Sequence, residues 1–496
     1  MRERRADVLI VGGGLGGVAA ALAAAGRGLD VVLSEPTDWI GGQLTSQAVP
    51  PDEHPWIETR GCTATYRALR DGIRAHYRAH FPLTFAARAV AHLNPGACFV
   101  SRLGHEPRVA LAVLEAMLAP HPVDLRLEHV PVAAETDGDR VAAVTLRGGG
   151  EDSVVVADWF LDASETGELL PLCGAEHVTG FESQAMTGEP HAPAAHQPDN
   201  LQPVSVCFAV DHQEGEDHTI PRPAHYEHFA PRFSWVAPDP RTNRPVARRF
   251  APNPDEDALA IGPDFSDPEL DKDLWRFRRI AARGLFAPGA YRSDITLVNW
   301  PQVDYTDEPV LDARAAGARE LSLSFLHWMQ TEAGFPGLRL RGDVVGDTSD
   351  GLAKHPYIRE ARRLRAVTTV REQHLTQGPA RYPDSVGVGA YRIDLHPSTG
   401  GDPYIDLASH PFEIPLGALV PQRVENLLGA GKAIGTTHIT NGAYRLHPVE
   451  WNAGEAAGHL AAHCAARGTT PRAVQARPEE LQRELEAAGV QLRWPY

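Results

Sequence analysis

The start of the chain changes from a strand-like to a helix-like pattern of apolar positions. Val8 to Val11 is a short apolar run, too short for a helix and typical of a buried strand. After a glycine cluster, Leu15 to Ala25 is rich in alanine and favours a helix. A second apolar run, Asp30 to Leu33, ends near Glu35. The pattern therefore predicts a strand, a turn, a helix and a second strand, which is the start of a βαβ unit.

The same kinds of apolar spacing predict further helices and strands. Apolar spacing places helices at 66–80, 107–118, 312–332 and 448–466, and strands at 126–130, 132–134, 141–146, 154–157 and 384–396. Glycines 148–150 join two of these strands as a hairpin. Two stretches rich in Pro, His, Asp and Asn, 184–200 and 237–268, are expected to be loops.

The composition of the sequence divides the chain into predicted domains. Glycine-rich turns between apolar strand-like and helix-like segments occur in the first 180 residues and again after residue 410. We therefore expect an α/β fold with a Rossmann-type domain formed by residues 1–180 and 410–466. Residues 181–409 would form an inserted α+β substrate domain, and residues 467–496 a polar tail with a short charged helix.

Charge and composition exclude several classes of partner. The net charge is −17, which argues against binding to nucleic acid or to an anionic membrane, because both require a basic surface. No apolar segment is long enough for a membrane span, and no signal peptide precedes the first strand. These features predict a cytoplasmic protein with a small-molecule substrate.

The chain shows no pattern of metal ligands. Its five cysteines are far apart and form no C-x-x-C, so neither a zinc nor an iron–sulfur framework is expected. His76 and His80 are four residues apart on a predicted helix, but no third ligand is near, and a solvated helix face explains them better. We expect reduced cysteines and no metal.

The glycine cluster has the spacing of a dinucleotide-binding turn. Gly12 permits the sharp turn, Gly14 lets the backbone approach a pyrophosphate, and Gly17 lets the helix pack closely on the strand. The unpaired N–H groups of the first helical turn point at an anion. Glu35 can accept hydrogen bonds from both ribose hydroxyls, and its charge disfavours the 2′-phosphate of NADP.

Two further stretches suggest contacts with a ligand. A second glycine pair, Gly41-Gly42, suggests a backbone that runs along an extended cofactor, although a simple turn is the better explanation when the pair is taken alone. Four arginines crowd into YIREARRLRA at positions 359, 362, 363 and 365. A basic helix face there could hold phosphate or a substrate carboxylate, whereas surface ion pairs are the alternative.

Together these segments resemble the FAD-dependent oxidoreductases with a glutathione-reductase-like flavin fold. The resemblance rests on VGGGLGGVAAALAAA, IGGQLT, FLDASETGELL, YIREARRLRA with DSVGVGAYRIDLH, and VENLLGAGKAIGTTHITNGAYRLHPVEWNAGEAAG. It implies FAD as the cofactor, with the first motif at the pyrophosphate and a helix N-terminus from the last motif against the flavin ring. Such a terminus would stabilise negative charge on the reduced flavin.

The resemblance implies cofactor contacts position by position. The implied FAD-binding residues are Gly12, Gly14, Leu15, Gly16, Gly17, Glu35, Gly41, Gly42, Gln43, Leu44, Thr45, Val130, Ala163, Gly431, His447, Val449 and Glu450. One position departs from the pattern, because many relatives have an aspartate just after the C-terminal glycine pair and this chain has Lys432. A lysine there could reach a phosphate.

The chain lacks the signal for a separate NAD(P)H domain, because no second G-x-G-x-x-G follows a strand. We therefore expect the substrate itself to deliver a hydride to flavin N5, with O2 or another acceptor reoxidising the cofactor. Such oxidation needs a base near neutrality, which suits histidine. The candidate catalytic residues, from the segments expected to meet the flavin, are Asp394, His396, His438, Asn441, Arg445 and His447.

Two other functions remain open. A flavin monooxygenase would be reduced by external NAD(P)H, and an electron-transfer subunit would pass electrons to a protein partner. The acidic composition and polar loops favour a free enzyme over the electron-transfer subunit. The arginine-rich segment favours an anionic or polyhydroxylated substrate. The sequence leaves its identity, the electron acceptor and the oligomeric state open.

Overall fold

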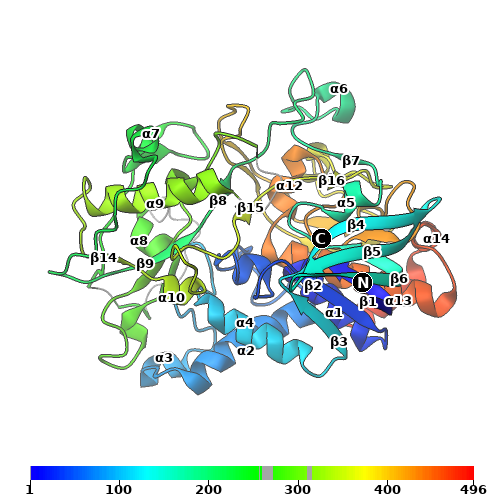
Figure 1. Cartoon of the computed structure of the whole chain (residues 1–496), viewed down its shortest axis with the longest axis horizontal. Coiled ribbons are helices and arrows are strands. Elements are labelled where there is room, and N and C mark those ends of the chain that lie inside the picture. The colour runs from blue at the N-terminus through cyan, green and yellow to red at the C-terminus, as the bar shows by residue number, and fades with distance from the viewer. Residues whose placement is uncertain (1, 256, 260–271, 310–314, 496) are drawn as a thin grey trace.

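The structure is a computed structural model that describes residues 2–255, 257–259, 272–309 and 315–495. Figure 1 shows a large sheet with its helices at one end of the molecule and a smaller sheet beside α9 (Ala316–Gln330) at the other. Segments from both ends of the chain meet at the large sheet, where the blue and orange ribbons of Figure 1 lie together.

The parallel part of the large sheet is built around β1 (Arg2–Val11). β2 (Val31–Glu35) pairs with β1 on one side, and β3 (Val123–Leu127) pairs with β2. β6 (Glu151–Asp162) pairs with β1 on the other side, and all these pairs are parallel. Buried apolar residues fill the second half of β1, Val8–Val11, and the first three positions of β2, as a sheet covered on both faces requires.

One edge of β6 is shared by two strands. β5 (Arg140–Gly148) pairs antiparallel with its first half, and β4 (Val130–Asp137) pairs with β5. β21 (Leu427–Gly429) pairs parallel with the last residues of β6. The chain is thus a mixed α/β protein with a parallel sheet of Rossmann-like order. The division into discontinuous and inserted domains stays a prediction.

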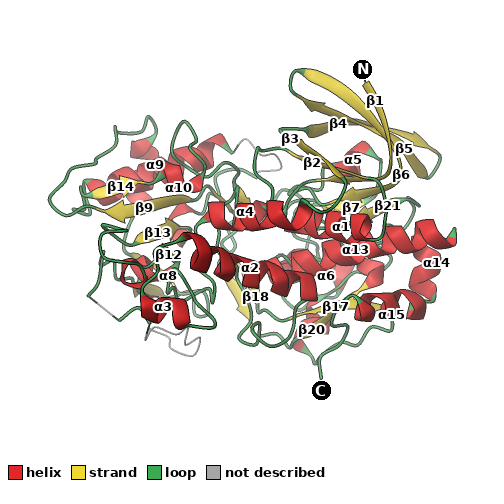
Figure 2. Ribbon diagram, turned by 90° about the horizontal axis from the view of Figure 1, so that it is seen from below, coloured by secondary structure: helices red, strands yellow, loops and turns green. Residues whose placement is uncertain are grey.

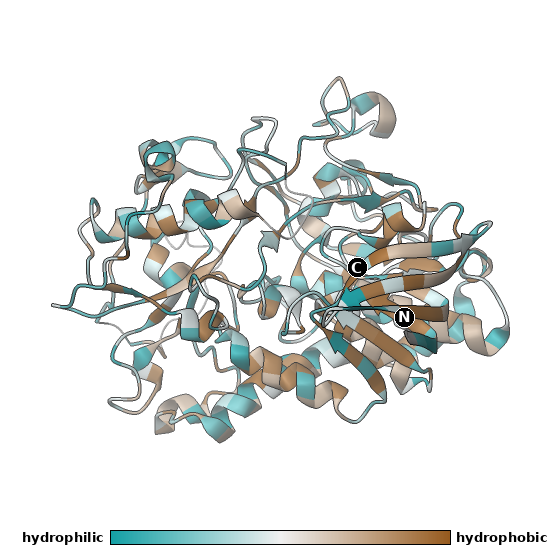
Figure 3. Cartoon of the chain, in the orientation of Figure 1, coloured by the Kyte–Doolittle hydropathy of each residue, from teal (hydrophilic) through white to brown (hydrophobic). Residues whose placement is uncertain are grey.

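Small residues bring two helices far apart in sequence into close contact. α1 (Leu15–Gly26) and α13 (His447–Arg467) lie side by side (Figure 2). A Cβ atom at Gly454 would lie 1.9 Å from the carbonyl oxygen of Gly16, so only glycine allows this approach. α2 (Ala64–His80) and α4 (Pro107–Leu118) pack beside them. Figure 3 shows apolar residues concentrated along α1 and the strands of the large sheet.

The second sheet is antiparallel, in the order β12 (Arg279–Ala281), β13 (Ile295–Val298), β9 (Phe208–His212) and β14 (Leu338–Leu340). Helix α9 contributes to the same core. The largest side chains of that core are aromatic: Phe208, Trp275, Trp300 and Phe325. The apolar residues of the second sheet are divided between this core and the one under the large sheet, which Ala209, Ile295 and Leu297 join.

The remaining elements are mostly short. The helices are α3 (Phe85–Ala89), α5 (Leu169–Leu172), α6 (Gln184–Thr187), α7 (Tyr226–Phe229), α8 (Leu274–Phe277), α10 (Gly342–Val345), α11 (Glu372–Thr376), α14 (Pro471–Ala476) and α15 (Glu479–Ala487). The strands β7 (His177–Val178), β8 (Val204–Ser205), β10 (Val236–Pro238) and β11 (Pro245–Ala247) lie in two-stranded pairs.

The arginine-rich segment is extended, so the basic helix considered for it is wrong. β15 (Tyr357–Ile358) pairs with β8, and β16 (Arg363–Leu364) pairs with β7. These strand pairs override the local helix propensity of the segment. Arg359 and Arg363 are buried in ion pairs, so surface ion pairs do not describe them either.

Other predicted elements are divided or extended. The strand predicted at 384–396 is two strands, β17 (Ser385–Gly389) and β18 (Ile393–Leu395). They belong to different pairs, with β20 (Phe412–Pro415) and β19 (Ile405–Leu407) respectively, and residues 390–392 between them are outside both strands. The predicted strand at 154–157 is part of the longer β6. Of the helix predicted at 312–332, residues 312–314 lie outside the described residues, and α9 covers residues 316–330.

Candidate functional site

The turn between β1 and α1 has the backbone that its glycines predict. Gly12 has a φ of +96°, and a Cβ there would lie 2.4 Å from the carbonyl oxygen of Ala163. Gly14 is the N-cap of α1 and supplies no side-chain cap, so the first N–H groups of the helix are left for another acceptor. This arrangement suits an anion above the turn.

Glu35, at the end of β2, contacts this turn directly. Its carboxylate accepts hydrogen bonds from the Gly13 N–H and the Thr37 N–H, each at 3.0 Å, and from the Thr37 hydroxyl at 2.7 Å. Burial raises the pKa of Glu35 to about 8, although the Thr37 hydrogen bonds lower it. The predicted ribose acceptor therefore lies beside the predicted phosphate turn.

Two other predicted cofactor segments meet the same turn. A Cβ at Gly42 would lie 2.9 Å from the Gly14 Cα, and one at Gly431 would lie 3.3 Å from the Ala163 Cα. The Glu450 carboxylate, in the first turn of α13, accepts from the Gly16 N–H at 3.4 Å. Glycine-rich segments from four parts of the chain thus converge at one place.

The residues present fit an extended polar cofactor. A Cβ at Gly14 would meet the side chains of Glu165 and Glu450 first, at 3.2 and 3.3 Å, so the missing side chain leaves a cradle lined by polar groups. Gln43 donates its amide to the Arg445 carbonyl oxygen at 3.0 Å, while among the described residues its buried Oε1 has no hydrogen-bond partner. Glu35, Val130 and Ala163 line a small hollow that continues from the turn.

A cavity of about 440 Å³ is lined by Arg445, whose carbonyl oxygen accepts from Gln43. One of its walls is the β18–β19 hairpin, which presents Asp394, His396, Tyr404 and Asp406 on a single face. Arg445, which precedes α13, closes the wall: its Nη2 lies 3.1 Å from Asp394 Oδ2. Three of the predicted catalytic residues, Asp394, His396 and Arg445, therefore line one cavity.

His396 is held between two carboxylates. Its Nδ1 lies 2.5 Å from Asp304 Oδ2, and its Nε2 lies 3.7 Å from Asp394 Oδ2. Burial and Arg359 lower the pKa of His396, but the two carboxylates outweigh them and raise it above its ordinary value. The raised pKa means that His396 holds its proton more strongly than a free histidine, and in its protonated form it stabilises negative charge and donates hydrogen bonds.

The two aspartates of the hairpin have opposite pKa shifts. Burial raises the pKa of Asp394, but His396 and Arg445 outweigh burial and lower it well below its ordinary value. Burial raises the pKa of Asp406 to about 6, with Asp394 contributing and Arg392 opposing. Asp394 is therefore a fixed charge, whereas Asp406 exchanges a proton near neutrality.

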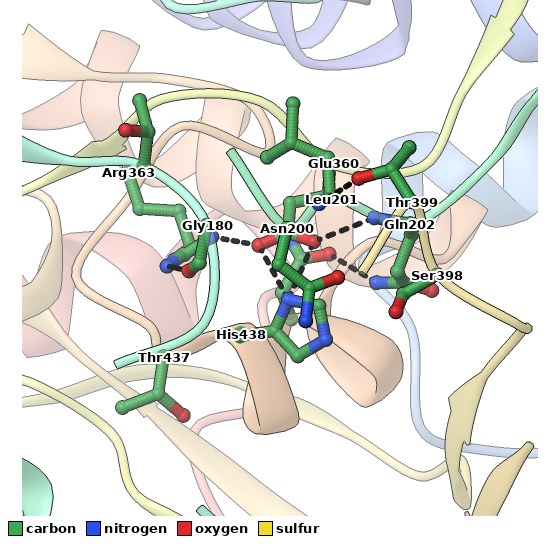
Figure 4. Close-up of polar contacts among 12 residues, drawn as sticks. Gly180, Asn200, Leu201, Gln202, Glu360, Arg363, Ser398, Thr399, Thr437 and His438 are labelled. Atoms are coloured by element: carbon green, nitrogen blue, oxygen red, sulfur yellow. Dashed lines mark hydrogen bonds and ion pairs between the residues drawn. The ribbon is translucent and has the colours of Figure 1, made fainter. Parts of the chain in front are cut away.

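His438 and Asn441 lie on α12 (His438–Tyr444), away from the cavity. The His438 Nδ1 lies 2.8 Å from the Glu360 carboxylate, and its ring stacks on Phe181 at 4.1 Å. Burial lowers the pKa of His438 to about 3. Figure 4 shows His438 next to Glu360, which also accepts from the Gln202 N–H at 3.2 Å.

His447 lies beneath the cavity floor. Its Nδ1 accepts from the Asp52 N–H at 3.1 Å, and its Nε2 donates to the Val49 carbonyl oxygen at 3.2 Å. Burial lowers the pKa of His447 to about 4, so it is neutral with both ring nitrogens occupied. The described wall of the cavity includes none of His438, Asn441 and His447.

Sequence reasoning missed Asp406, Tyr404 and Asp304. A signal for the first was present, because the triplet Ile-Asp-Leu occurs at 393–395 and again at 405–407. These triplets pair with each other in the hairpin, Asp394 opposite Asp406. Asp304 carries no comparable signal, since only the packing of distant segments brings it to His396.

The glycine turn, the acid at the end of β2 and the Rossmann-like sheet are the features of a dinucleotide-binding protein. The family model for FAD dependent oxidoreductases matches residues 7–485, so the chain belongs to that family. It is therefore an enzyme that uses FAD, as the resemblance implied. No curated protein matches the chain.

The solved structures that match the chain do so at low similarity. An L-proline dehydrogenase from P. horikoshii is 16% identical over 37% of this chain and 25% of its own, with a TM-score of 0.19. The anhydrotetracycline hydroxylase OxyS from Streptomyces rimosus is 14% identical over 98% of this chain and 65% of its own, with a TM-score of 0.37. A geranylgeranyl bacteriochlorophyll reductase-like protein from Thermoplasma acidophilum is 11% identical over 98% of this chain and 83% of its own, with a TM-score of 0.33. The chain spans less than two thirds of the first two.

The described residues form neither a membrane-spanning helix nor a metal-binding cluster. None of the helices there has the length and apolar content to cross a membrane. The same residues contain no group of three or more His, Cys, Asp or Glu side chains placed to hold a metal ion.

Proposed function

We propose that this enzyme oxidises a small polar organic substrate held in the cavity, with O2 or another acceptor taking the electrons. The observation that carries the proposal is the placement of residues 445–450. Arg445 lines the cavity, while Glu450 contacts the N–H of Gly16 at the cofactor turn. FAD, when bound, supplies an acceptor for two electrons and a proton.

The residues of the hairpin have distinct parts in this proposal. Asp406 accepts the proton that the substrate loses, since its pKa of about 6 suits a base near neutrality. His396, protonated between Asp304 and Asp394, stabilises negative charge that develops on the substrate. Arg445 holds Asp394 in place. This assignment replaces the histidine base with an aspartate base.

The lining favours a polyhydroxylated substrate over a simple anion. Four of its six arginines are paired with acids, among them Arg278 with Asp52 at 2.9 and 3.1 Å, and Arg445 with Asp394. Such pairs neutralise the net charge but present alternating donors and acceptors, which hydroxyl groups match because they both donate and accept. Tyr404, whose ring lies 5.3 Å from that of His396, adds an aromatic wall.

Anaerobic bleaching of the yellow holoenzyme by a panel of polyols, sugar acids and hydroxy acids tests the proposal. A substrate should bleach the flavin in the wild type and far more slowly in Asp406→Asn, while FAD stays bound. Bleaching by no compound, together with substrate-dependent NAD(P)H consumption, would replace the proposal by a flavin monooxygenase. Reduction through a protein partner alone would indicate an electron-transfer subunit.

A further inference from the structure

Lys432 and Glu165 form a buried ion pair at the cofactor turn. The Lys432 ammonium contacts the Glu165 carboxylate and donates to the Ile358 carbonyl oxygen at 2.7 Å. The other oxygen of Glu165 lies 3.2 Å from a Cβ built on Gly14 and 3.1 Å from one built on Gly42. A carboxylate of the protein thus occupies the space that two glycines leave beside the start of α1.

Acidic groups outnumber basic groups around this pair. The acidic groups are Glu35 at the end of β2, Asp162 at the end of β6, Glu165 and Glu168 in the loop after β6, and Glu450 in α13. The facing basic groups are Lys432, Arg362 and His355. Burial lowers the pKa of His355, so it adds no charge at neutral pH.

Burial already favours protons on several of these acids. It raises the pKa of Glu168 and of Glu450 to about 7 each. Glu165 differs, because Lys432 outweighs burial and lowers its pKa. Its charge therefore depends on the ammonium that contacts it.

We propose that FAD binding takes up a proton: the pyrophosphate takes the Lys432 ammonium from Glu165, and Glu165 is then protonated from solvent. A cation at the turn stabilises the dianionic pyrophosphate. Lys432 can supply that cation, because its ammonium contacts the Glu165 carboxylate, which occupies the space beside the turn. Once it has lost that partner, Glu165 is a buried carboxylate among other acids, an environment that favours its neutral form. The proton on Glu165 offsets the charge that the cofactor brings.

The test is the pH dependence of FAD affinity. The holoenzyme is diluted in series at several values between about pH 6 and about pH 9, and released FAD is measured by its fluorescence. Uptake of one proton makes the Kd rise by up to about tenfold per pH unit. Glu165→Gln should flatten this slope and bind FAD more tightly at the alkaline end. Glu479→Gln, an exposed residue of α15, is the matched control and should keep the wild-type slope.

Lys432→Met tests the other half of the pair and should weaken FAD binding at every pH. Should Glu165→Gln fail to fold by circular dichroism, the double variant with Lys432→Met buries no unpaired charge and should give a Kd that rises less steeply with pH than that of the wild type. A wild-type Kd that does not change with pH would overturn the proposal. So would a slope that Glu165→Gln or the double variant retains in full.

Discussion

Asp394 and Asp406 lie directly opposite each other in the antiparallel β18–β19 pair, and both line the cavity. Like charges in such positions repel each other. Each carboxylate has its own guanidinium, Arg445 for Asp394 and Arg392 for Asp406. The repulsion adds to the effect of burial on Asp406, while Asp394 keeps its charge through His396 and Arg445. The hairpin thus separates two chemically identical side chains into a fixed charge and a proton acceptor.

The first prediction concerns the stability contributed by Asp406. Its pKa is about 6 in the folded protein against an ordinary 3.8, so the folded state binds its proton more tightly than the unfolded state. Its contribution to stability is therefore full below pH 3.8 and is lost as the pH rises through about 6. Asp406→Asn cannot titrate, so its Tm relative to wild type should rise between about pH 4 and about pH 7. Asp406→Glu keeps an acid and is the control, and parallel Tm curves for wild type and Asn variant would contradict the prediction.

The second prediction concerns His396 and uses a substrate found by anaerobic bleaching. His396→Ala should keep FAD bound but slow flavin reduction by about 10²–10³-fold, because it removes a preorganised positive charge from the cavity. Rapid-mixing absorbance at the flavin band measures this rate. His438→Gln, outside the cavity, should stay within a few-fold of wild type. Equal slowing in both variants would show that the position of His396 in the cavity is not what matters.

The third prediction concerns cofactor retention. Glu35→Ala removes the acceptor of the Gly13 N–H and of both Thr37 hydrogen bonds. Leaving such buried donors unpaired should weaken FAD binding by about tenfold or more. The ratio of flavin to protein absorbance after gel filtration measures retention. Glu479→Ala on the surface should retain FAD like the wild type, and equal retention by Glu35→Ala would refute a role for this carboxylate.

The fourth prediction concerns the contact between α1 and α13. Gly454→Ala forces a Cβ against the Gly16 carbonyl oxygen and should destabilise the protein by about 1–3 kcal/mol. Urea unfolding followed by circular dichroism measures the loss. Gly26→Ala, at the end of α1, is matched in chemistry, and its Cβ would meet only His121, at 3.8 Å. The control should therefore unfold at the urea concentration of the wild type or above it.

Local signals in the sequence predicted the cofactor turn well. Residues 8–35 carry their strand, turn and helix in consecutive positions, and Pro107–Leu118 forms the helix that its period predicted. In both segments the period of apolar residues and the turn residues predict the same secondary structure, and the tertiary contacts preserve it. The family resemblance and the FAD requirement, which rest on the same turn, are confirmed by the family match.

Local sequence patterns predicted only some of the residues that form the cavity. Asp394 and His396 share a face because side chains alternate along a strand, and this much follows from local order. Their partner Asp304 comes from a loop about 90 residues earlier in the chain, and no local pattern places it there. Helix α12 was missed because its start depends on a cap: the Thr437 side chain accepts from the Thr440 N–H. The catalytic roles stay predictions.

The shared edge of β6 also sets an order of events during synthesis. β5 can pair with β6 as soon as residue 162 has left the ribosome, but β21 must wait for residue 429 and α13 for residue 467. Until then the glycine turn lacks the helix that packs on α1 and the carboxylate that reaches Gly16. The nascent chain therefore carries a half-built nucleotide site with an exposed apolar face through most of its translation. Contacts of such long sequence separation slow folding, which makes the docking of residues 427–467 the step that commits the enzyme to its cofactor.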